Sequence, residues 1–378
     1  MLERVHDVAV IGGGLNGTAI ARDAAGRGLS VFLCDAGDIG GGASWQTPKV
    51  IHGSLSLMER LDIAGMRAAV TEREILMRAA PPLLRPLRFR IPYHDRLWSK
   101  TAFSIGLFAF DHAARRSLPK ARRVHIERED AWGELQGHFE LAFEYGDCAV
   151  DDARLALLNA LDAQAHGASI HPRVRCILAE REGARWRLSL ETETSREPAV
   201  AYATILVNAA GAAAGDLHNH VAHARPEVQV RTRRSVSMIV RRPVSLAAGV
   251  GYALPDADGQ IVYAFPLTEQ LLHVGPSHIE VGDLARAEGL RQGIAYLADV
   301  TAQYFHTPIA RTDIVRPLVS ETVLPAGTSR AEFSVRIEAP PQLAPLVSVF
   351  GGDLVGHRRR AEEVVDGLQR FRPVGRPW

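Results

Sequence analysis

Short apolar runs recur at the start, the middle and the end of the chain, and most of them end in a glycine turn. Four of them read as buried parallel strands: DVAVI (7–11), LSVFLCD (29–35), ATILVNAAG (203–211) and PLVSVFGG (345–352). Between the first two, Leu15, Ala19 and Ile20 share one face of a helix that ends near Gly26 and Gly28. This order predicts a βαβ unit at the start of a nucleotide-binding domain that is assembled from separated segments.

The rest of the pattern predicts further helices and a β-rich insert. Helices are predicted over residues 62–80, 151–167, 284–305 and 354–370, and Asp151 and Gly167 are expected to begin and end the second of them. Alternating apolar and polar positions predict a β-meander over 169–190 and mainly β structure over 228–280. Four prolines between 81 and 92 exclude a regular helix there, so we interpret this stretch as a passage between domains.

Composition adds limits on the class of protein. A chain of 378 residues is long enough for two domains, each with its own core. The net charge of +1 gives no indication of nucleic-acid binding. Cys34, Cys148 and Cys176 are odd in number and have no CxxC spacing, which favours reduced thiols in a cytoplasm-like compartment and no metal site.

Two segments bear on membranes. The N-terminus carries acidic residues and no long apolar core, so we do not expect a signal peptide. The run TAFSIGLFAF (101–110) is too short to span a bilayer. Two interpretations of this run remain open: a buried helix or strand, or a segment that lies against a membrane surface.

The first glycine turn has the pattern GxGxxG, formed by Gly12, Gly14 and Gly17 directly after a strand and at the start of a helix. These glycines permit a tight turn, a close approach of backbone to a pyrophosphate, and packing of helix on strand. Asp35, at the end of the next strand, is placed to accept hydrogen bonds from a ribose. The pattern predicts a dinucleotide site, and the late return strand with its own glycine turn favours FAD over NAD.

Beyond this motif, several longer stretches resemble one family. They are VIGGGLNG, AAGRGLSV, KVIHGSL, TEREILMRAAPPLLRPLRFRIP, IGLFAFDHAARRSLP, FEYGDCAVDDARLALLNA, VNAAG and VSVFGG. Read in order, they are similar to the FAD-dependent respiratory glycerol-3-phosphate dehydrogenases and cover almost the whole chain. The resemblance implies hydride transfer from a secondary alcohol carbon to FAD, with electrons passed to quinone at a membrane.

The fold class that follows is α/β: a two-domain flavoprotein with a Rossmann-like FAD-binding domain and an antiparallel β-sheet cap or substrate domain. We predict that the FAD-binding domain consists of residues 1–85, 145–225 and 343–378, and that the cap domain consists of residues 86–144 and 226–342.

The resemblance also implies site residues. Beside the glycine motif and Asp35, the cofactor-binding set is Ser44, Lys49, His52, Ala210, Gly211, Gly351, Gly352, Asp353 and Leu354. The candidate catalytic residues are His52, as a ring contact or a base, and Arg316, as the group that binds an anion. The alternatives are a structural histidine and a surface arginine before a proline.

Several positions depart from the family pattern. Ser56, Leu57, Ser237 and His278 stand where the family has an arginine, a tyrosine, a histidine and an aspartate. The family's helical C-terminal domain has no counterpart in this sequence. We interpret His357 as a packing or polar contact, and the run Arg358–Arg360 as a mostly solvated helix face.

Asp353 is the departure with the largest expected consequence, because it replaces a lysine beside the flavin. Two charges about 4 Å apart interact by roughly 4 kcal/mol at an intermediate dielectric, so an aspartate would oppose the negative charge of a reduced flavin. The other interpretation is that Asp353 caps the last helix.

Two main hypotheses follow. The first is an FAD-dependent oxidoreductase that acts on a small hydroxy compound, phosphorylated or not, with an altered substrate. The second is a non-catalytic flavin-binding or partner-binding relative; a soluble NAD-dependent dehydrogenase is a third. The expected partners are a small-molecule substrate and a quinone or other electron acceptor, without nucleic acid. The expected location is the cytoplasm, with any membrane contact peripheral and on the inner face.

Overall fold

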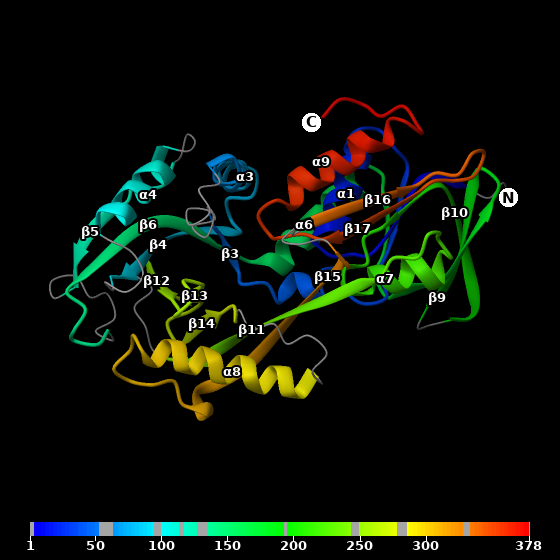
Figure 1. Ribbon diagram of the computed structural model, residues 1–378. Helices are drawn as coiled ribbons and strands as arrows, with labels where there is room; N and C mark the ends of the chain where they lie inside the picture. Colours follow the sequence, from blue (N-terminus) through cyan, green and yellow to red (C-terminus); the bar gives the residue numbers. More distant parts are fainter. Residues whose placement is uncertain are drawn as a thin grey trace. The chain divides into compact units, whose positions relative to one another are not determined.

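In a computed structural model, the chain forms two compact units (Figure 1). The structure describes residues 4–52, 63–93, 100–112, 117–126, 135–192, 195–242, 249–277, 286–327 and 333–377. The first unit consists of Met1–Trp45, Asp151–Arg233 and Glu321–Trp378, and the second consists of Gln46–Val150 and Arg234–Ser320. The predicted limits of the FAD-binding domain and of the cap domain stay predictions, because they assign a function to each part of the chain.

The first unit contains a mainly parallel sheet with the strand order β16-β17-β10-β1-β2-β7. Its strands are β1 (Val5–Ile11), β2 (Val31–Cys34), β7 (Ser169–His171), β10 (Ser195–Asn208), β16 (Phe333–Glu338) and β17 (Leu346–Gly351). All neighbours run parallel except β16, which pairs antiparallel with β17. The four apolar runs predicted as buried strands are β1, β2, β10 and β17, so that prediction is confirmed.

Three helices cover one face of this sheet (Figure 1). They are α1 (Leu15–Gly26), α6 (Asp152–Ala165) and α9 (His357–Leu368). Ile20 of α1, Ala163 of α6 and Val365 of α9 belong to one buried cluster with the strands. Asp151 caps α6, because its carboxylate accepts a hydrogen bond from the Arg154 N–H at 3.2 Å. Helix α6 therefore begins where the sequence predicts.

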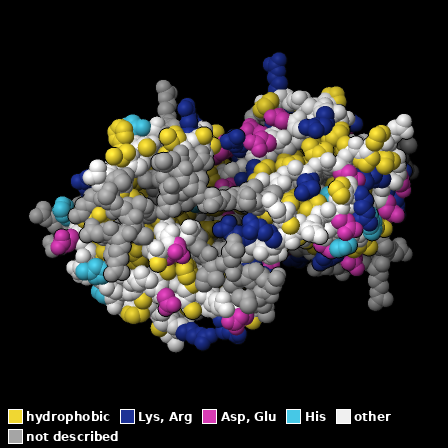
Figure 2. Space-filling model, in the orientation of Figure 1, with side chains coloured by type: hydrophobic (Ala, Val, Ile, Leu, Met, Phe, Trp, Pro, Cys, Tyr) yellow, Lys and Arg dark blue, Asp and Glu magenta, His cyan; other side chains and the backbone are white. Residues whose placement is uncertain are grey.

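A β-hairpin lies against the other face of the sheet. It is formed by β8 (Val174–Glu182) and β9 (Arg185–Thr192), and β9 also pairs with β10. Trp186 and Leu188 of β9 share a buried cluster with Phe32 of β2. Three short helical segments follow β10: η2 (Gly211–Ala213), α7 (Ala214–Asp216) and η3 (Leu217–Val221). Figure 2 shows basic and acidic side chains mixed over the visible face of this unit, as the near-neutral charge leads one to expect.

Most of a nine-stranded sheet forms the second unit, with the order β15-β11-β14-β13-β12-β4-β6-β3 and with β5 paired to β6; residues 230–233 of β11 and 321–325 of β15 belong to the first unit. The strands are β3 (Val50–Ile51), β4 (Leu84–Pro92), β5 (Arg122–His125), β6 (Leu141–Val150), β11 (Val230–Arg241), β12 (Val250–Pro255), β13 (Ile261–Pro266), β14 (Leu271–Gly275) and β15 (Ile314–Pro325). Antiparallel pairs include β4–β6 and β13–β14, whereas β12 and β4 run parallel. The sheet is therefore mixed at β4, where an antiparallel sheet is predicted.

Helices pack on both faces of the second sheet. On one face lies α8 (Arg286–Ala302), whose Leu297 is buried with Tyr252 of β12. On the other face lie α3 (Ile63–Ala79) and α4 (Lys100–His112); Val70 and Phe110 of these helices share a cluster with Phe89 of β4. Two short 3-10 helices complete the described elements: η1 (Ala43–Trp45) in the first unit and η4 (Arg311–Asp313) in the second.

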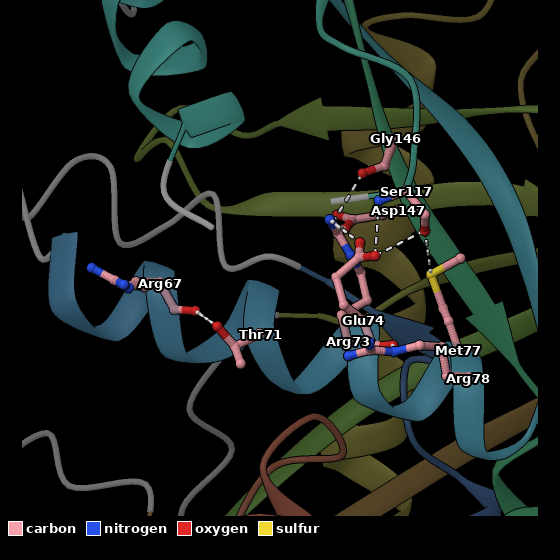
Figure 3. Close-up of polar contacts among 9 residues, drawn as sticks. All are labelled: Arg67, Thr71, Arg73, Glu74, Met77, Arg78, Ser117, Gly146 and Asp147. Carbon is pink, nitrogen blue, oxygen red and sulfur yellow. Dashed lines mark hydrogen bonds and ion pairs between the residues drawn. The ribbon is translucent and has the colours of Figure 1, made fainter. Parts of the chain in front are cut away.

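A fully buried ion pair ties α3 to the sheet (Figure 3). The Arg73 guanidinium reaches from α3 to the Asp147 carboxylate and the Gly146 carbonyl of β6. The next residue, Glu74, accepts hydrogen bonds from the backbone N–H and the hydroxyl of Ser117, both at 2.8 Å. The helix is thus fixed by charge as well as by apolar contacts.

The interpretation of residues 81–92 as a passage between domains is wrong. Residues 84–92 are strand β4, which pairs with β6 over its whole length inside the second unit. Pro86 is tolerated there because β12 pairs only with Arg88, Phe89 and Arg90, so no strand pair loses a hydrogen bond on that side. The prolines exclude a helix, as predicted, but they do not exclude a strand.

The apolar run 101–110 belongs to α4, which confirms the helical option for this segment. Phe103, Leu107 and Phe110 are buried, whereas Ile105 and Phe108 are 64% and 65% exposed. Among the helices that the structure describes, none combines the length and the apolar character needed to cross a membrane.

Candidate functional site

At two positions, the turn between β1 and α1 has room for glycine only. Gly12 has φ +117°, and a Cβ placed on it would lie 2.3 Å from the carbonyl oxygen of Ala209, just after β10. A Cβ on Gly17 would lie 1.9 Å from the carbonyl oxygen of Gly12. Both positions therefore require glycine, one for its backbone conformation and for space, the other for space. The resulting turn leaves only backbone at the end of the strand, as a pyrophosphate site needs.

The amino terminus of α1 is suited to hold an anion. Gly14 is the N-cap and offers no side chain, and the hydroxyl of Ser44 accepts a hydrogen bond from the Leu15 N–H at 2.8 Å. The first turn of α1, which is described in full, holds no acidic residue. The positive end of the helix dipole therefore faces outward without an acidic residue in the helix's own first turn to weaken it. Ser44 thus lies at the amino terminus of α1, and its contact with a cofactor stays a prediction.

Asp35 follows β2 and has a structural role that the sequence did not reveal. Its two carboxylate oxygens accept hydrogen bonds from the N–H groups of Gly13, at 2.6 Å, and Gly37, at 2.7 Å. A carboxylate has about four acceptor sites, so this half-buried side chain can still accept ribose hydroxyls. Asp35 first holds the glycine turn and then remains available for the predicted ribose contact.

The last glycine turn lies beside the first. Gly351 and Gly352 have φ of +72° and +104°, and the side-chain amide of Asn16 donates to the Gly351 carbonyl at 3.0 Å. Because β17, β10 and β1 are neighbours and parallel, their carboxyl ends meet at one edge of the sheet. Ala210 and Gly211 follow β10 at the same edge. Sequence reasoning missed Asn16, although a polar residue in the first turn of an otherwise apolar helix was a usable signal.

Asp353 is neutralised by a residue that the sequence did not single out. Its carboxylate accepts hydrogen bonds from the Arg360 guanidinium at 2.6 Å and from the Gly356 N–H at 2.8 Å. The same guanidinium donates to the Asp353 carbonyl and lies 5.2 Å from the centre of the Phe333 ring. The charge that would oppose a reduced flavin is therefore paired within its own turn.

Two predictions about this helix need correction. Asp353 is not the N-cap of α9, because residues 353–356 form a turn and Gly356 is the N-cap. The carboxylate still caps an N–H group, that of Gly356, three residues ahead of it. Arg360 does not belong to a solvated face: it is 9% exposed, since its guanidinium is used by Asp353. Arg358 and Arg359 pair with acids one turn later on the same helix.

Lysine at position 353 is expected to weaken the first unit rather than repair it. Asp353→Lys would set an ammonium against the buried Arg360 guanidinium and remove the acceptor for the Gly356 N–H. We expect a loss of about 2 kcal/mol or more in the free energy of unfolding, measured by thermal unfolding of the FAD-loaded protein. Adding Arg360→Met to this variant should recover most of the loss. Equal stability of the single variant and the wild type would contradict the pairing.

His357 fills the space behind the same turn, as its predicted packing or polar role requires. It is 2% exposed, and a ring nitrogen lies 2.7 Å from the Leu354 carbonyl oxygen. Burial lowers the pKa of His357 to about 4, so the ring is neutral at pH 7. Leu354 itself is buried, and its carbonyl serves the histidine. The predicted cofactor contact of Leu354 stays a prediction.

In the second unit, Lys49 and His52 flank the short strand β3. Lys49 has φ +57°, and its carbonyl accepts a hydrogen bond from the Val150 N–H at 2.9 Å. The half-buried His52 ring lies nearly parallel to the Tyr263 ring of β13, with the centroids 6.3 Å apart and an interplanar angle of 11°. Tyr263 was missed, because nothing in the sequence connects β13 with residue 52.

His273 on β14 is the second residue that sequence reasoning missed. It is fully buried, and neither ring nitrogen has a hydrogen-bond partner among the described residues. Its ring lies against that of Phe265, with centroids 4.9 Å apart. Burial, together with the charge of Lys49, lowers the pKa of His273 to about 3. A histidine in an apolar run, LLHV, was the only sequence signal.

This buried histidine predicts a pH dependence of stability. The unfolded chain takes up a proton on residue 273 near pH 6.5, while the folded chain takes it up only near pH 3. Stability from this group is thus complete above pH 6.5 and falls as the pH drops from 6.5 towards 3, by up to about 1.4 kcal/mol per pH unit. His273→Leu should flatten the decline between pH 7 and 5 in urea unfolding, and His125→Leu, at an exposed site, should not. Identical slopes for all three proteins would refute this.

The remaining predicted residues are dispersed. Arg316 is exposed on β15, and Ser237 is 3% exposed on β11, where a Cβ on Gly275 would lie 2.3 Å from its hydroxyl. Ser56, Leu57 and His278 lie outside the described residues. The structure therefore brings the predicted dinucleotide residues of the first unit together along one edge. Arg316, His52 and Lys49 all belong to the second unit.

Known proteins resemble this chain over nearly its whole length. A family model described as FAD dependent oxidoreductase matches residues 7–332. The glycerol-3-phosphate dehydrogenase of Pseudomonas aeruginosa is 37% identical over 98% of this chain and 73% of its own length. The aerobic glycerol-3-phosphate dehydrogenase of Escherichia coli is 33% identical over 98% and 75%, respectively. The D-erythritol 1-phosphate dehydrogenase of Brucella abortus is 31% identical over 98% and 75%.

Solved structures show the same fold. The glycerol-3-phosphate dehydrogenase of Bacillus halodurans, complexed with FAD, superimposes with a TM-score of 0.74 and 20% identity over 100% of this chain and 67% of that one. The L-α-glycerophosphate oxidase of Mycoplasma pneumoniae, with FAD bound, gives 0.73 and 16% over 99% and 97%. At this identity the likeness establishes the two-domain flavoprotein architecture and nothing about substrate.

Proposed function

We propose that this chain, which belongs to the family of FAD-dependent oxidoreductases, oxidises a secondary alcohol of a small polyol phosphate. The observation that carries the proposal is the glycine edge of the first unit, where Gly12, Gly17 and the bare amino terminus of α1 provide a pyrophosphate site. The substrate class rests on relatives that are named for glycerol 3-phosphate and for D-erythritol 1-phosphate.

The residues present fit FAD. Side chains are excluded where the pyrophosphate would approach, and Asp35 retains acceptor sites for a ribose. The Ser44 hydroxyl and the open N–H groups of α1 would hold the phosphate oxygens. When bound, FAD supplies the acceptor for a hydride from the alcohol carbon. Because Arg360 neutralises Asp353, the side chain at 353 need not prevent that transfer.

The second unit supplies the proposed substrate groups. We assign His52 as the base: it removes the hydroxyl proton as the carbon loses a hydride, so that the C–O bond becomes a carbonyl. The parallel Tyr263 ring limits the orientations that the imidazole can take. Arg316 and Lys49 are assigned to the phosphate, since a guanidinium binds two phosphate oxygens at once and an ammonium adds a point charge.

The electron acceptor and the location stay part of the proposal. We assign a quinone or another small acceptor, and a cytoplasmic location with any membrane contact peripheral to the inner face. This assignment rests on the resemblance to respiratory dehydrogenases. The non-catalytic alternative rests on the replaced residues, and among the described ones its main support was Asp353, which is paired.

An absorption experiment without oxygen tests the proposal. FAD-loaded protein should lose its visible flavin band on addition of glycerol 3-phosphate or erythritol phosphate, and far more slowly with glycerol. His52→Asn should slow the bleaching by about a hundredfold, the lower end for loss of a general base. His112→Asn, at an exposed site on α4, is the matched control. A flavin band that no polyol phosphate bleaches would favour the non-catalytic alternative.

A further inference from the structure

A small cavity lies in the first unit at the end of β1 that is remote from the glycine turn. Its volume is about 260 Å³, and its lining includes Arg4, His6, Phe32, Ser169, His171 and Tyr202. Six residues of extended chain, at about 3.3 Å each, separate His6 from Gly12 by roughly 20 Å. Figure 1 shows the N-terminus beside β10, which contributes Tyr202 to the lining. The cavity is thus separate from the proposed pyrophosphate site.

The cavity holds a buried polar atom that lacks a partner. His6 is 8% exposed, and its Nδ1 is buried without a hydrogen-bond partner among the described residues. Because this Nδ1 is shielded from solvent, a ligand in the cavity would meet the other nitrogen of the His6 ring. Across the cavity, Nε2 of His171 lies 2.7 Å from the Ser169 hydroxyl, which can rotate to serve a ligand.

One aromatic ring holds the two imidazoles in place. The Phe32 ring stacks on His171, with centroids 4.9 Å apart and an interplanar angle of 29°, and contacts His6 at 5.7 Å. Both histidines are therefore positioned on β-strands with their rings packed against a common neighbour. This is a rigid arrangement, of the kind that binds without a large ordering cost.

The cavity lining carries one positive charge, that of Arg4, and two imidazoles that can become cationic. Its described lining contains Arg4 and two histidines and no carboxylate. Burial, then the charges of Arg4 and His171, lower the pKa of His6. Asp7 acts in the opposite direction, but its carboxylate accepts hydrogen bonds from the N–H and hydroxyl of Ser30 at 2.7 and 2.8 Å, and it pairs with Arg372. An anion in the cavity would offset the effect of Arg4 and so favour protonation of the rings.

We propose that this cavity binds a small dianion of the phosphate monoester class, held by Arg4, His6, His171 and the Ser169 hydroxyl. A volume of about 260 Å³ lies just below the range of about 300–1,000 Å³ that is typical of sites for drug-sized ligands, so the cavity suits a phosphate with a short organic group better than a dinucleotide. Arginine and histidine donors are the usual partners of phosphate oxygens. The site is independent of the proposed reaction, because none of its residues belongs to the glycine edge.

Binding should strengthen as the pH falls. The pKa values of His6 and His171 both lie below 6.5 without an anion, so both rings are neutral at pH 7. A dianion favours the protonated rings, so its binding takes up protons on them. Free phosphate also takes up a proton, with a second pKa of about 6, so affinities are compared at equal concentrations of the dianion. The groups that face these rings are Arg4, Asp7, Ser169 and Tyr202, of which only Asp7 is acidic. The change is expected between pH 8 and 6.

Proton NMR of the histidines in the FAD-loaded protein tests this site, with inorganic phosphate as the probe and chloride at equal ionic strength as the reference. Two of the 15 histidines should shift in a saturable way, more strongly at pH 6 than at pH 8. His6→Gln and Arg4→Gln should each weaken phosphate binding about tenfold, whereas His166→Gln, at an exposed position beside Asp162, should not. Arg4 is exposed, so its variant keeps the test valid if the buried change prevents folding.

The flavin absorbance separates this site from the dinucleotide site. It should stay constant throughout the titration, because phosphate at the distal cavity leaves the glycine edge untouched. Phosphate shifts that persist unchanged in both variants, shifts that do not saturate, or release of FAD by phosphate would each overturn the proposal. The first two outcomes leave the bleaching experiment untouched, and release of FAD is told from bleaching because released FAD keeps its visible band, so the two proposals can fail separately.

Discussion

Replacing Gly17 with alanine is expected to weaken FAD binding at least about a thousandfold, or roughly 4 kcal/mol. The added Cβ would lie 1.9 Å from the Gly12 carbonyl oxygen, a backbone atom that no side-chain rotation can move. Relief requires α1 to shift away from β1, and such a shift carries the helix N-terminus away from the phosphates. Equilibrium dialysis or flavin fluorescence on the purified variant measures the change.

Gly42→Ala is the matched control for this experiment. It adds the same methyl group in the loop before η1, where nothing lies within 4 Å and where the backbone is not in the left-handed region. FAD affinity should be unchanged there. If Gly17→Ala bound FAD as tightly as Gly42→Ala does, the glycine edge would not be the pyrophosphate site, and the proposed function would lose the observation that carries it.

The dinucleotide edge could be predicted because its determinants are local. Gly12, Gly14 and Gly17 lie in one strand–turn–helix segment, and their spacing indicates directly at which positions a side chain must be absent. The second glycine turn, Gly351–Gly352, was found in the same way from an apolar run followed by glycines. The hydrogen bond between the two turns, from the Asn16 amide to the Gly351 carbonyl, could not be predicted, because it joins residues far apart in sequence.

The role of Asp353 shows where local reasoning failed. An aspartate before a helix suggests an N-cap, but the helix begins at His357, which leaves the carboxylate free to reach Arg360. That contact spans seven residues, about two helical turns, and it reverses the electrostatic conclusion about the flavin. A charge run such as Arg358–Arg360 therefore cannot be treated as one face, because successive residues on a helix point about 100° apart.

The second unit was less predictable because its sheet is assembled from distant segments. Strand β4 pairs with β6 on one side and with β12 on the other, and no local sequence pattern predicts either partner. Its prolines instead suggested a break. The consequence reaches the candidate site: His52 meets Tyr263 only because β3 and β13 belong to the same sheet. Residues whose roles depend on strand order lie beyond sequence reasoning.

The buried pair Arg73–Asp147 gives the largest expected effect on stability. Both side chains are 0% exposed, so Asp147→Leu would leave a guanidinium in the core with the Gly146 carbonyl and Glu74 as its remaining partners. Removing one member of such a pair costs about 3–5 kcal/mol, because the desolvated charge that stays behind is no longer compensated. Urea unfolding followed by tryptophan fluorescence and by circular dichroism should show this loss.

The double variant separates charge from packing. Arg73→Met with Asp147→Leu removes both charges and keeps apolar volume between α3 and β6, so most of the loss should be recovered. Glu182→Leu is the surface control. It breaks an ion pair with Arg185 at 2.8 Å, in which both side chains are 40% exposed. Its loss should cost less than about 1 kcal/mol in the free energy of unfolding. A double variant no more stable than Asp147→Leu would mean that the pair holds α3 by specific hydrogen bonds rather than by mutual neutralisation. A cost for Asp147→Leu as small as that for Glu182→Leu would mean that water reaches Arg73 and solvates the ion pair that fixes α3 in Figure 3.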